Sequence, residues 1–348
     1  MGSTNAARRN KGSLREFAFR PCALGLALAS AFSWPAGAQV LPSGASVVSG
    51  SAAIQQNGAR LTVTNSPGAI INWQSFSIGA GATAQFVQQG ASSSVFNRVT
   101  GSDPSAILGN LVSNGKVFLI NPNGITVGAG ARIDAAAFVA SSLGISNADL
   151  LAGRFRFEAT PGSANVVNHG TIVTQDGGFV YFVGRNVENS GIIHTPRGEI
   201  ILAAGNAVEI INPRSPDLRV EIAAGANEAV NLGRLVASGG TIGMFGGSVR
   251  QRGVASANTA EVDARGRIVF RARRDVDLAA GSRTEASGPA GGTVTIQAET
   301  GTASVAGVVE ARGVATPIVE SPPQPVQIAA TTPLVSAAPL PLQPAADA

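Results

Sequence analysis

A corner of the form Asn-x-Gly recurs along the chain at a regular interval, and this repeat limits the folds that the sequence can adopt. Asn168-His169-Gly170 returns 21 residues later as Asn189-Ser190-Gly191, and 42 residues after that as Asn231-Leu232-Gly233. Arg252-Gly253 continues the series. Short apolar or alternating runs follow each corner, as expected for strands joined by turns. A period of about 21 residues indicates a solenoid of stacked units.

The solenoid that fits this repeat best is a right-handed, single-stranded parallel β-helix of the pectin-lyase type, an all-β fold. The Leu-x-x-Leu-x-Leu pattern of a leucine-rich repeat is absent, and a propeller blade needs a period of about 40 residues. At about 21 residues per coil, residues 39–310 predict about 13 coils. A β-helix exposes a sheet edge at each end, so we expect a cap at each end, including an N-terminal one.

The corner residues have distinct expected roles. The 43 glycines supply the positive φ angles that sharp corners need. Asparagines that repeat down one corner can form a ladder in which each side-chain amide bonds the next. A short helix is predicted near residues 146–152, where Ser146 and Asp149 form a capping pattern.

Residues 1–38 have the features of a secretory signal peptide. Five basic residues stand against the single acid Glu16, and an apolar run of about ten residues follows. Ala36 and Ala38 then form an Ala-x-Ala cleavage site before Gln39. The apolar run is shorter than the roughly 20 residues that span a bilayer, so no stable membrane span is expected.

Removal of this segment changes the charge and redox character of the chain. The full chain has 25 basic and 21 acidic residues, of which residues 1–38 hold five and one. The chain from Gln39 onward therefore carries 20 of each, and the single cysteine, Cys22, is also lost. No disulfide or cysteine-rich zinc site can form, and a nucleic-acid partner is not expected.

Three segments in the first half of the chain carry the most specific motifs. They are Ala69–Phe76 (AIINWQSF), Val95–Gly101 (VFNRVTG) and Lys116–Ile125 (KVFLINPNGI). Their order and spacing resemble the secretion domain of the filamentous haemagglutinin and high-molecular-weight adhesin family, whose best mark is the Asn-Pro-Asn-Gly-Ile block. The resemblance covers about residues 39–211. The family's second motif, Asn-Pro-Asn-Leu, has no match here.

The resemblance implies an exoprotein of two-partner secretion in a Gram-negative bacterium. Such a protein crosses the periplasm, is exported by an outer-membrane β-barrel transporter, and is secreted or stays at the cell surface, where adhesion or aggregation is expected. A truncated or decoy member of a long exoprotein family is an alternative. The implied secretion and transporter-recognition motif consists of Asn121, Pro122, Asn123, Gly124 and Ile125, together with Asn97 and Arg98.

The local chemistry of this motif also allows a purely structural role. Pro122 fixes its own φ, Asn121 can form an Asx turn, and Gly124 favours the left-handed geometry that Asn123 tolerates. Residues 121–124 are therefore predicted to form a stiff turn after a strand. Arg98 is predicted to be a solvated residue at a strand end.

Four regions follow from these observations. They are a signal peptide (1–38), a two-partner secretion domain with its cap (39–211), further β-helix coils (212–314) and a Pro/Ala-rich tail (315–348). The tail holds 8 of the 19 prolines. This composition is typical of an extended, disordered segment.

A secreted polysaccharide-acting enzyme is the alternative outside the family, because such enzymes cluster carboxylates on one face of a β-helix. The candidate cluster contains Asp263, Asp275 and Asp277, near Arg265, Arg267 and Arg271. The mixture of acids with basic neighbours favours a solvated charged face. No catalytic residue, metal site or cofactor is therefore predicted.

Three weaker patterns complete the search for a site. His169 and His194 lie in turn-like contexts without metal-ligand spacing. Residues 79–84 match the Gly-x-Gly-x-x-Ala dinucleotide fingerprint, but an alternating strand pattern follows instead of a helix. Residues 250–274 hold seven arginines and two acids. A solvated outer face is favoured there, and host or bacterial surface glycans are the anionic partners to consider.

Overall fold

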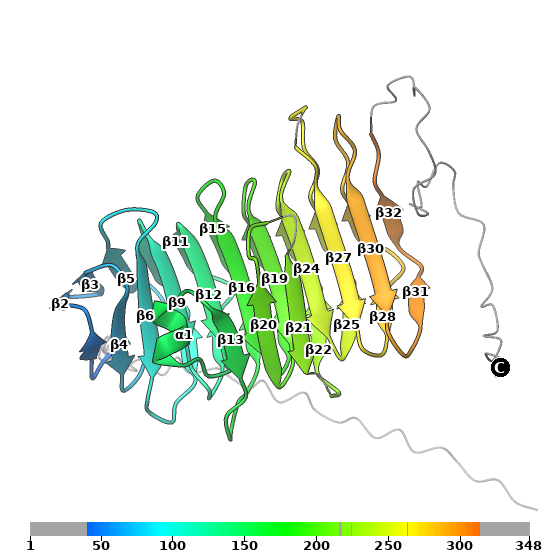
Figure 1. The fold of residues 1–348 in the computed structure, drawn as a ribbon. Helices are drawn as coiled ribbons and strands as arrows, with labels where there is room; N and C mark the ends of the chain where they lie inside the picture. The colour runs from blue at the N-terminus through cyan, green and yellow to red at the C-terminus, as the bar shows by residue number, and fades with distance from the viewer. Residues whose placement is uncertain (1–39, 216–217, 224, 263, 314–348) are drawn as a thin grey trace, which may run out of the picture. The chain divides into compact units, whose positions relative to one another are not determined.

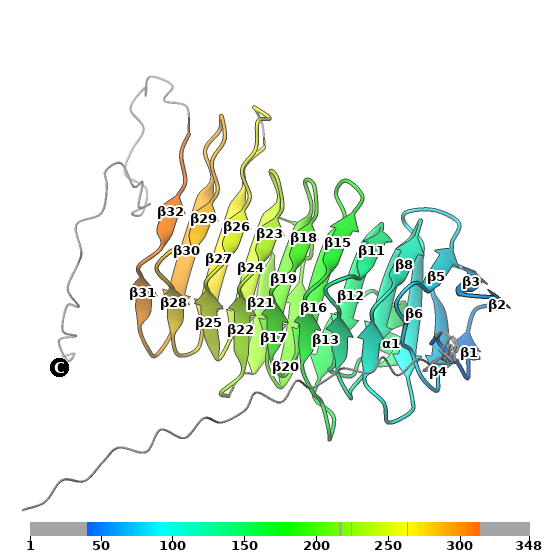
Figure 2. The same cartoon turned by 180° about the vertical axis from the view of Figure 1, so that it is seen from behind.

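The computed structural model describes residues 40–215, 218–223, 225–262 and 264–313. The chain divides into two units, residues 1–38 and 39–348, and every described residue lies in the second. The strands of this unit form three long sheets that share each coil of a solenoid (Figure 1, Figure 2). The predicted all-β parallel β-helix is confirmed.

Sheet 1 has ten strands. In spatial order from the N-terminal end they are β1 (Ser46–Ser49), β4 (Ala69–Trp73), β6 (Ser94–Val99), β9 (Lys116–Ile120), β12 (Ala137–Ser141), β16 (Phe179–Gly184), β19 (Glu199–Ala204), β24 (Thr241–Gly246), β27 (Arg267–Ala272) and β30 (Thr293–Ala298).

Sheets 2 and 3 complete each coil. Sheet 2 has eight strands, β7 (Ser105–Ile107), β10 (Ile125–Val127), β14 (Val166–Asn168), β17 (Val187–Asn189), β22 (Glu228–Asn231), β25 (Ser248–Gln251), β28 (Val276–Leu278) and β31 (Ala303–Val305). Sheet 3 has eleven strands, β2 (Ala52–Asn57), β3 (Arg60–Asn65), β5 (Thr83–Val87), β8 (Asn110–Ser113), β11 (Arg132–Ala135), β15 (Thr171–Thr174), β18 (Ile192–His194), β23 (Arg234–Val236), β26 (Val254–Ser256), β29 (Arg283–Glu285) and β32 (Val308–Glu310).

The strands of each coil pair in parallel with those of the neighbouring coils. Val117 of β9, for example, lies opposite Val95 of β6 and Phe138 of β12. The inward-facing apolar side chains form one core along the coils. The central strands of sheet 1 are buried on their outer face as well, and a strand buried on both faces is apolar at nearly every position, as β16 is.

Antiparallel strands close the N-terminal end of the solenoid. β1 pairs antiparallel with β4, and β2 pairs antiparallel with β3. The parallel ladders begin only at β3 and β4, so β1 and β2 cover edges that would otherwise be open to another chain. The predicted N-terminal cap is confirmed.

Two insertions make the coils fewer than the repeat predicted. Asn189 of β17 pairs directly with Asn231 of β22, so the 42 residues that separate them form one coil and not two periods. The extra residues form β20 (Ala207–Ile211) and β21 (Arg219–Ala223). A second insertion, between β12 and β14, holds α1 (Asn147–Leu151) and β13 (Phe155–Glu158). The predicted number of coils was therefore wrong.

The two insertions combine on the outer face of sheet 1. β13, β20 and β21 form a three-stranded antiparallel sheet, here called the cover sheet. Together with α1 it lies in front of the central strands of sheet 1 in Figure 1. A second apolar core, which includes Phe118, Phe157 and Tyr181, fills the space between the layers. α1 begins where predicted, and its cap Ser146 accepts the Asp149 N–H at 3.0 Å.

The predicted ladder of side-chain amides runs down the corner between sheets 2 and 3. Asn168 Nδ2 donates to Asn189 Oδ1 at 2.7 Å, and Asn189 Nδ2 donates to Asn231 Oδ1 at 2.8 Å. Asn231 Nδ2 donates in turn to Gln251 Oε1 at 2.8 Å, so a glutamine fills the fourth rung. All four side chains are fully buried, and each bond satisfies polar atoms whose burial would otherwise be costly.

The glycines beside this ladder are required for a reason that the sequence did not indicate. Gly170, Gly191, Gly233 and Gly253 stack in one column, and none of them has a positive φ. A Cβ on Gly191 would lie 2.1 Å from the Gly170 carbonyl oxygen. One on Gly233 would lie 2.1 Å from the Gly191 carbonyl oxygen. The close approach of successive coils, and not the φ angle, therefore requires glycine in this column.

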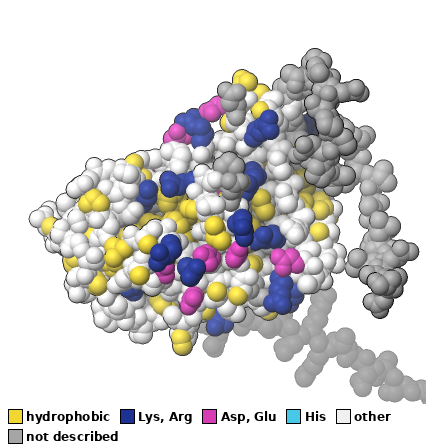
Figure 3. Space-filling view, viewed as in Figure 1, with side chains coloured by type: hydrophobic (Ala, Val, Ile, Leu, Met, Phe, Trp, Pro, Cys, Tyr) yellow, Lys and Arg dark blue, Asp and Glu magenta, His cyan; other side chains and the backbone are white. Residues whose placement is uncertain are grey.

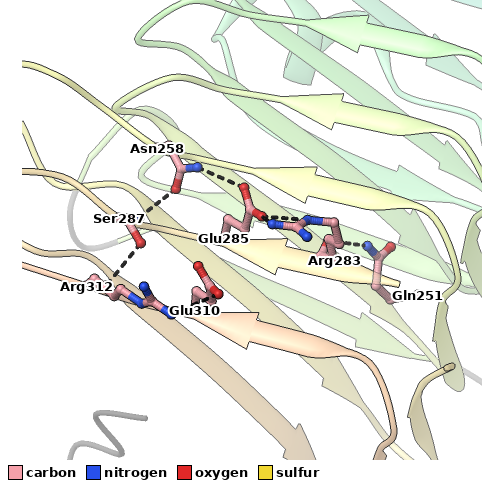
Figure 4. A network of polar contacts seen from close by, with 7 residues as sticks. All are labelled: Gln251, Asn258, Arg283, Glu285, Ser287, Glu310 and Arg312. Atoms are coloured by element: carbon pink, nitrogen blue, oxygen red, sulfur yellow. Dashed lines mark hydrogen bonds and ion pairs between the residues drawn. The ribbon is translucent and has the colours of Figure 1, made fainter. Parts of the chain in front are cut away.

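Polar side chains tie the last coils together along the end of sheet 3 (Figure 4). Gln251 Nε2 donates to the Arg283 carbonyl oxygen at 3.2 Å. Arg283 Nε donates to Glu285 Oε1 at 2.7 Å, and Asn258 Nδ2 donates to Glu285 Oε2 at 2.9 Å. Within the described ranges no antiparallel strand pairs with the last strand of any of the three sheets. The second expected cap is therefore not among these residues.

Candidate functional site

Residues 121–125 form the corner between β9 and β10. Asn121 Oδ1 accepts the Asn123 N–H at 3.0 Å, which is the predicted Asx turn. The Asn121 carbonyl oxygen accepts the Gly124 N–H at 3.0 Å. Gly124 has a φ of +106°, whereas Asn123 has no positive φ, so glycine alone adopts the left-handed geometry.

The two asparagine side chains of this corner bond to the preceding coil. Asn121 is fully buried, and its Nδ2 donates to the Asp103 carbonyl oxygen and to Ser105 Oγ, both at 2.9 Å. Asn123 Nδ2 donates to the Gly101 carbonyl oxygen at 2.9 Å. Both side chains therefore stabilise a contact between coils that exists only after folding.

The backbone of the same corner bonds to the following coil. The Pro122 carbonyl oxygen accepts the Ala164 N–H at 2.9 Å, and the Ile125 N–H donates to the Asn165 carbonyl oxygen at 3.1 Å. The Ile125 side chain lies in the main core. Residues 121–125 consequently fasten three successive coils, and in the folded protein a partner cannot reach the Asn121 side chain.

Asn97 lies in β6, one coil before this corner. It is opposite Leu119, two residues before Asn121. Its side chain is fully buried, with Oδ1 accepting from Trp73 Nε1 at 2.9 Å and Nδ2 donating to the Phe118 carbonyl oxygen at 3.2 Å. Asn97 is thus a buried polar link between its own coil and the coils before and after it, and not a surface residue.

Arg98 points to the outer face of sheet 1 and binds the insertion that holds α1. Its two terminal nitrogens donate to Asn147 Oδ1 and to the Ile145 carbonyl oxygen, both at 2.8 Å. Partial burial lowers the pKa of the Arg98 guanidinium. The prediction of a solvated Arg98 was wrong, because residues 145–147 fold back over β6 and supply hydrogen-bond acceptors.

Several predictions fall on residues that the structure does not describe. The cleavage site at Ala36, Ala38 and Gln39 and the tail at 315–348 lie outside the described ranges, and they stay predictions, as does the domain boundary at residue 211. In the part of the chain that is described, no helix is long and apolar enough to cross a membrane.

The carboxylates of the alternative enzyme site have structural partners. Asp275 Oδ1 accepts the Thr302 N–H at 3.1 Å and so holds a corner. Asp277 lies 3.9 Å from Arg252 in an exposed ion pair, and Asp263 lies outside the described residues. Within the described ranges, no group of three or more His, Cys, Asp or Glu side chains could hold a metal ion.

The arginines expected beside those carboxylates hold the cover sheet instead. Arg271 donates to the Val220 carbonyl oxygen and lies over the Phe245 ring, 5.5 Å from its centroid. Arg267 donates to the Leu218 carbonyl oxygen at 3.4 Å. Both contacts attach the insertion that holds β20 and β21 to sheet 1.

The weaker sequence patterns also have simple structural roles. His169 is exposed, with Nδ1 2.5 Å from Ser190 Oγ. Residues 79–84 lead into strand β5, so the expected glycine turn is confirmed. In the arginine-rich stretch, Arg250 forms a 2.9 Å ion pair with Glu228. Binding of glycans to this stretch stays a prediction.

A groove that the sequence did not indicate lies between the outer face of sheet 1 and the insertions. Its volume is about 370 Å³. Figure 3 shows apolar side chains flanked by basic ones on this face. Lys116, the single lysine after residue 38, was the one cue available in the sequence. The aromatic and basic residues that line the groove are Phe96, Phe118, Phe155, Phe179, Lys116, Arg154 and Arg214.

A buried polar pair supports one side of this groove. The Tyr181 hydroxyl donates to Glu199 Oε2, which also accepts the Arg214 N–H at 3.2 Å. Burial raises the pKa of the Glu199 carboxyl, and burial together with the neighbouring Glu199 raises the pKa of Tyr181. Glu199 therefore carries a free-energy cost when it ionises in the folded protein.

The variant Glu199→Gln is expected to weaken the pH dependence of stability. A carboxyl whose pKa is raised on folding stabilises the fold only below its unfolded pKa, here near 4.5, and that stability is lost as the pH rises through the folded pKa. Glutamine keeps an oxygen for Tyr181 and cannot ionise. In thermal melts, the variant should gain stability relative to the wild type above about pH 4.5. If the stability of the two proteins changed with pH in the same way, this account would be contradicted.

Comparison with known proteins agrees with the fold. A family model described as "TPS secretion domain" matches residues 38–281. A solved structure, the HMW1 secretion domain from Haemophilus influenzae, is 39% identical with a TM-score of 0.73. That match covers 77% of this chain and 73% of the solved chain.

Two curated relatives are heme/hemopexin-binding proteins of Haemophilus influenzae. The one from strain Rd is 36% identical over 180 residues, which is 49% of this chain and 20% of the relative. The other is 33% identical over 100 residues, which is 29% of this chain and 11% of the relative. The chain therefore spans a fifth or less of the length of these two relatives.

Proposed function

The chain belongs to the family of TPS (two-partner secretion) secretion domains, which direct an exoprotein to its cognate outer-membrane transporter, and from this premise we propose how its motif works. Residues 121–125, with Asn97 and Arg98, are recognised by the transporter while the chain is still unfolded. The same residues then hydrogen-bond the first coils to one another outside the cell. The protein is secreted or surface-exposed and acts without catalysis.

The burial of Asn121 carries this proposal. Its side-chain amide bonds to Asp103 and Ser105 of the preceding coil, and the side chain has no exposed surface. A transporter domain that reads this amide must therefore meet it before the coils stack. An extended segment can pair with such a domain by adding a strand to the edge of a sheet. Folding then removes the recognition element.

Stacking of coils also supplies a direction for transport. In a solenoid each unit is stabilised chiefly by its neighbours, so folding propagates from a nucleus. Residues 121–125 join three coils near the N-terminal cap, and they are well placed to form that nucleus. Once these coils have folded outside the membrane, return of the chain would first require them to unfold, at the cost of their mutual stabilisation.

The double variant Asn121→Ala plus Asn123→Ala tests this proposal. The change leaves the buried Ser105 hydroxyl without its partner, at a cost of about 1–3 kcal/mol, and removes the bonds to the carbonyl oxygens of Asp103 and Gly101. We expect slower refolding of the purified protein and a sharp fall in the fraction secreted by cells that contain the cognate transporter. Refolding is measured by far-UV circular dichroism, and secretion by immunoblotting of the medium and the periplasm.

A matched control uses two asparagines with exposed side chains, Asn57→Ala plus Asn110→Ala. This control should be secreted and should refold like the wild type. If the double variant at 121 and 123 left both secretion and the refolding rate unchanged, the proposal would fail. Unchanged refolding with lost secretion would support recognition of the unfolded motif over a purely structural role.

The role after export is adhesion or aggregation in this proposal. The two heme/hemopexin-binding relatives match this chain over only 20% and 11% of their own length, so heme binding is not carried over to it. Adhesion is tested by comparing the aggregation of cells that secrete the protein with that of cells that lack its gene. A transporter gene beside the gene for this chain would support the export route.

A further inference from the structure

The groove beside α1 is lined by four phenylalanine rings, of which Phe96, Phe118 and Phe179 are almost fully buried and Phe155 is partly exposed. Phe96 and Phe118 lie with ring centroids 4.7 Å apart, and Phe118 stacks on Phe155 at 6.0 Å. Phe155 meets Phe179 edge-to-face at 6.3 Å. The rings come from β6, β9, β13 and β16, and the parallel register of sheet 1 together with the cover sheet brings them into one surface.

Two cations line this groove, Lys116 and Arg214, and the charge of Arg214 also acts on the buried Glu199 carboxyl. Lys116 is partly buried, and its pKa is lowered by burial and by the positive charge of Arg214. The Arg214 guanidinium lies over the Phe179 ring, 5.6 Å from its centroid. The ion pairs of the described residues include neither Lys116 nor Arg214. A carboxylate between the two would relieve their mutual repulsion.

The backbone that holds Arg214 is in an unfavourable conformation. Asn212 has a φ of +51° and Arg214 a φ of +61°, and left-handed geometry is uncommon for residues other than glycine. Such a conformation persists only where the surroundings enforce it. The Arg214 N–H donates to the buried Glu199 carboxylate, which is one contact that holds this segment.

We propose that this groove binds an extended acidic peptide segment of a partner protein, with a carboxylate between Lys116 and Arg214 and an adjacent aromatic or aliphatic side chain on the phenylalanine rings. The volume of about 370 Å³ falls in the range of roughly 300–1,000 Å³ typical of ligand sites. No acidic residue is among the described residues that line it, so its charge is complementary to such a segment. The insertions build this site, which is separate from the 121–125 corner and exists only in the folded protein.

Fluorescence anisotropy with a labelled Glu-Phe-Glu-Leu-Glu peptide tests the proposal on the purified chain. We expect saturable binding that weakens about tenfold in Lys116→Gln and in Arg214→Gln, since each removes one hydrogen bond to a charged group. Lys116→Arg keeps the charge and should bind within a few-fold of the wild type. Arg219→Gln removes an exposed charge on β21, away from the groove lining, and should bind like the wild type.

A second peptide, Lys-Phe-Lys-Leu-Lys, distinguishes recognition of negative charge from nonspecific hydrophobic binding. We expect this peptide not to bind. Equal binding of the two peptides would overturn the proposal. So would unchanged affinity in the double variant Lys116→Gln plus Arg214→Gln, or no saturation by the acidic peptide up to millimolar concentration. Circular dichroism spectra matched to the wild type ensure that a weakened variant is still folded.

Discussion

Gly191→Ala is expected to lower the free energy of unfolding by about 3 kcal/mol or more, because overpacking against a rigid neighbour forces the backbone to move. The added Cβ would lie 2.1 Å from the Gly170 carbonyl oxygen and 2.7 Å from the His169 carbonyl carbon. Both atoms belong to the backbone of the coil below, so no side-chain rotation can relieve the clash. The two coils must separate, and the parallel ladder between β15 and β18 must weaken.

Urea unfolding followed by far-UV circular dichroism measures this effect. Gly90→Ala is the matched control, because its Cβ would have no heavy atom within 4 Å and its φ is not positive. That variant should stay within about 0.5 kcal/mol of the wild type, as surface substitutions usually do. A Gly191→Ala protein as stable as the Gly90→Ala protein would show that the coils can move apart at little cost.

Asn189→Ala is the second change for which a large loss is expected. Asn189 is the second rung of the amide ladder. Its removal leaves Asn231 Oδ1 without its partner in a fully buried corner, and Asn168 Nδ2 keeps only its 3.3 Å bond to the Gly170 carbonyl oxygen. Each unsatisfied group costs about 1–3 kcal/mol. We therefore expect a loss of about 4 kcal/mol in the free energy of unfolding, including the cavity that remains.

The same urea experiment applies to this variant, with the exposed Asn110→Ala as its control. A loss below about 1 kcal/mol would contradict the ladder as a main support of the corner, since it would equal one ordinary hydrogen bond. Asn189→Asp gives a further comparison. It keeps the acceptor for Asn168 but places an acid, which cannot donate when ionised, in a buried corner, so its loss should grow as the pH rises.

The repeating parts of this fold could be predicted from the sequence. Asn168, Asn189 and Asn231 repeat because each occupies the same corner of a coil, and their ladder follows from that register. The turn at residues 121–124 depends on Pro122, Gly124 and an Asx bond between neighbours in the chain. Such local chemistry is visible in a single sequence, and the fold class, the N-terminal cap and the turn were all predicted correctly.

The insertions could not be predicted in this way. Asn189 and Asn231 are 42 residues apart, which is twice the period. An insertion of one period within a single coil therefore gives the same spacing in the sequence as two complete coils. Arg98 was predicted to be solvated because its hydrogen-bond acceptors, Ile145 and Asn147, lie 47 and 49 residues further along the chain. The phenylalanine groove has no periodic signature at all, because its rings come from strands of two different sheets.

The sequence by itself determined that this chain is a solenoid with glycine at its corners and a stiff Asn-Pro-Asn-Gly turn. Its motifs also resembled those of a secretion domain, and periodic spacing and turn chemistry are local enough to be read without a structure. Only the tertiary structure shows that the Asn121 side chain is buried after folding. It also shows that the close approach of successive coils, and not the φ angle, requires glycine in the column that contains Gly191. Finally, it shows that two insertions and sheet 1 together form a cationic groove lined by aromatic rings. These features arise from contacts between residues distant in the chain, and no local pattern records which distant surfaces will meet.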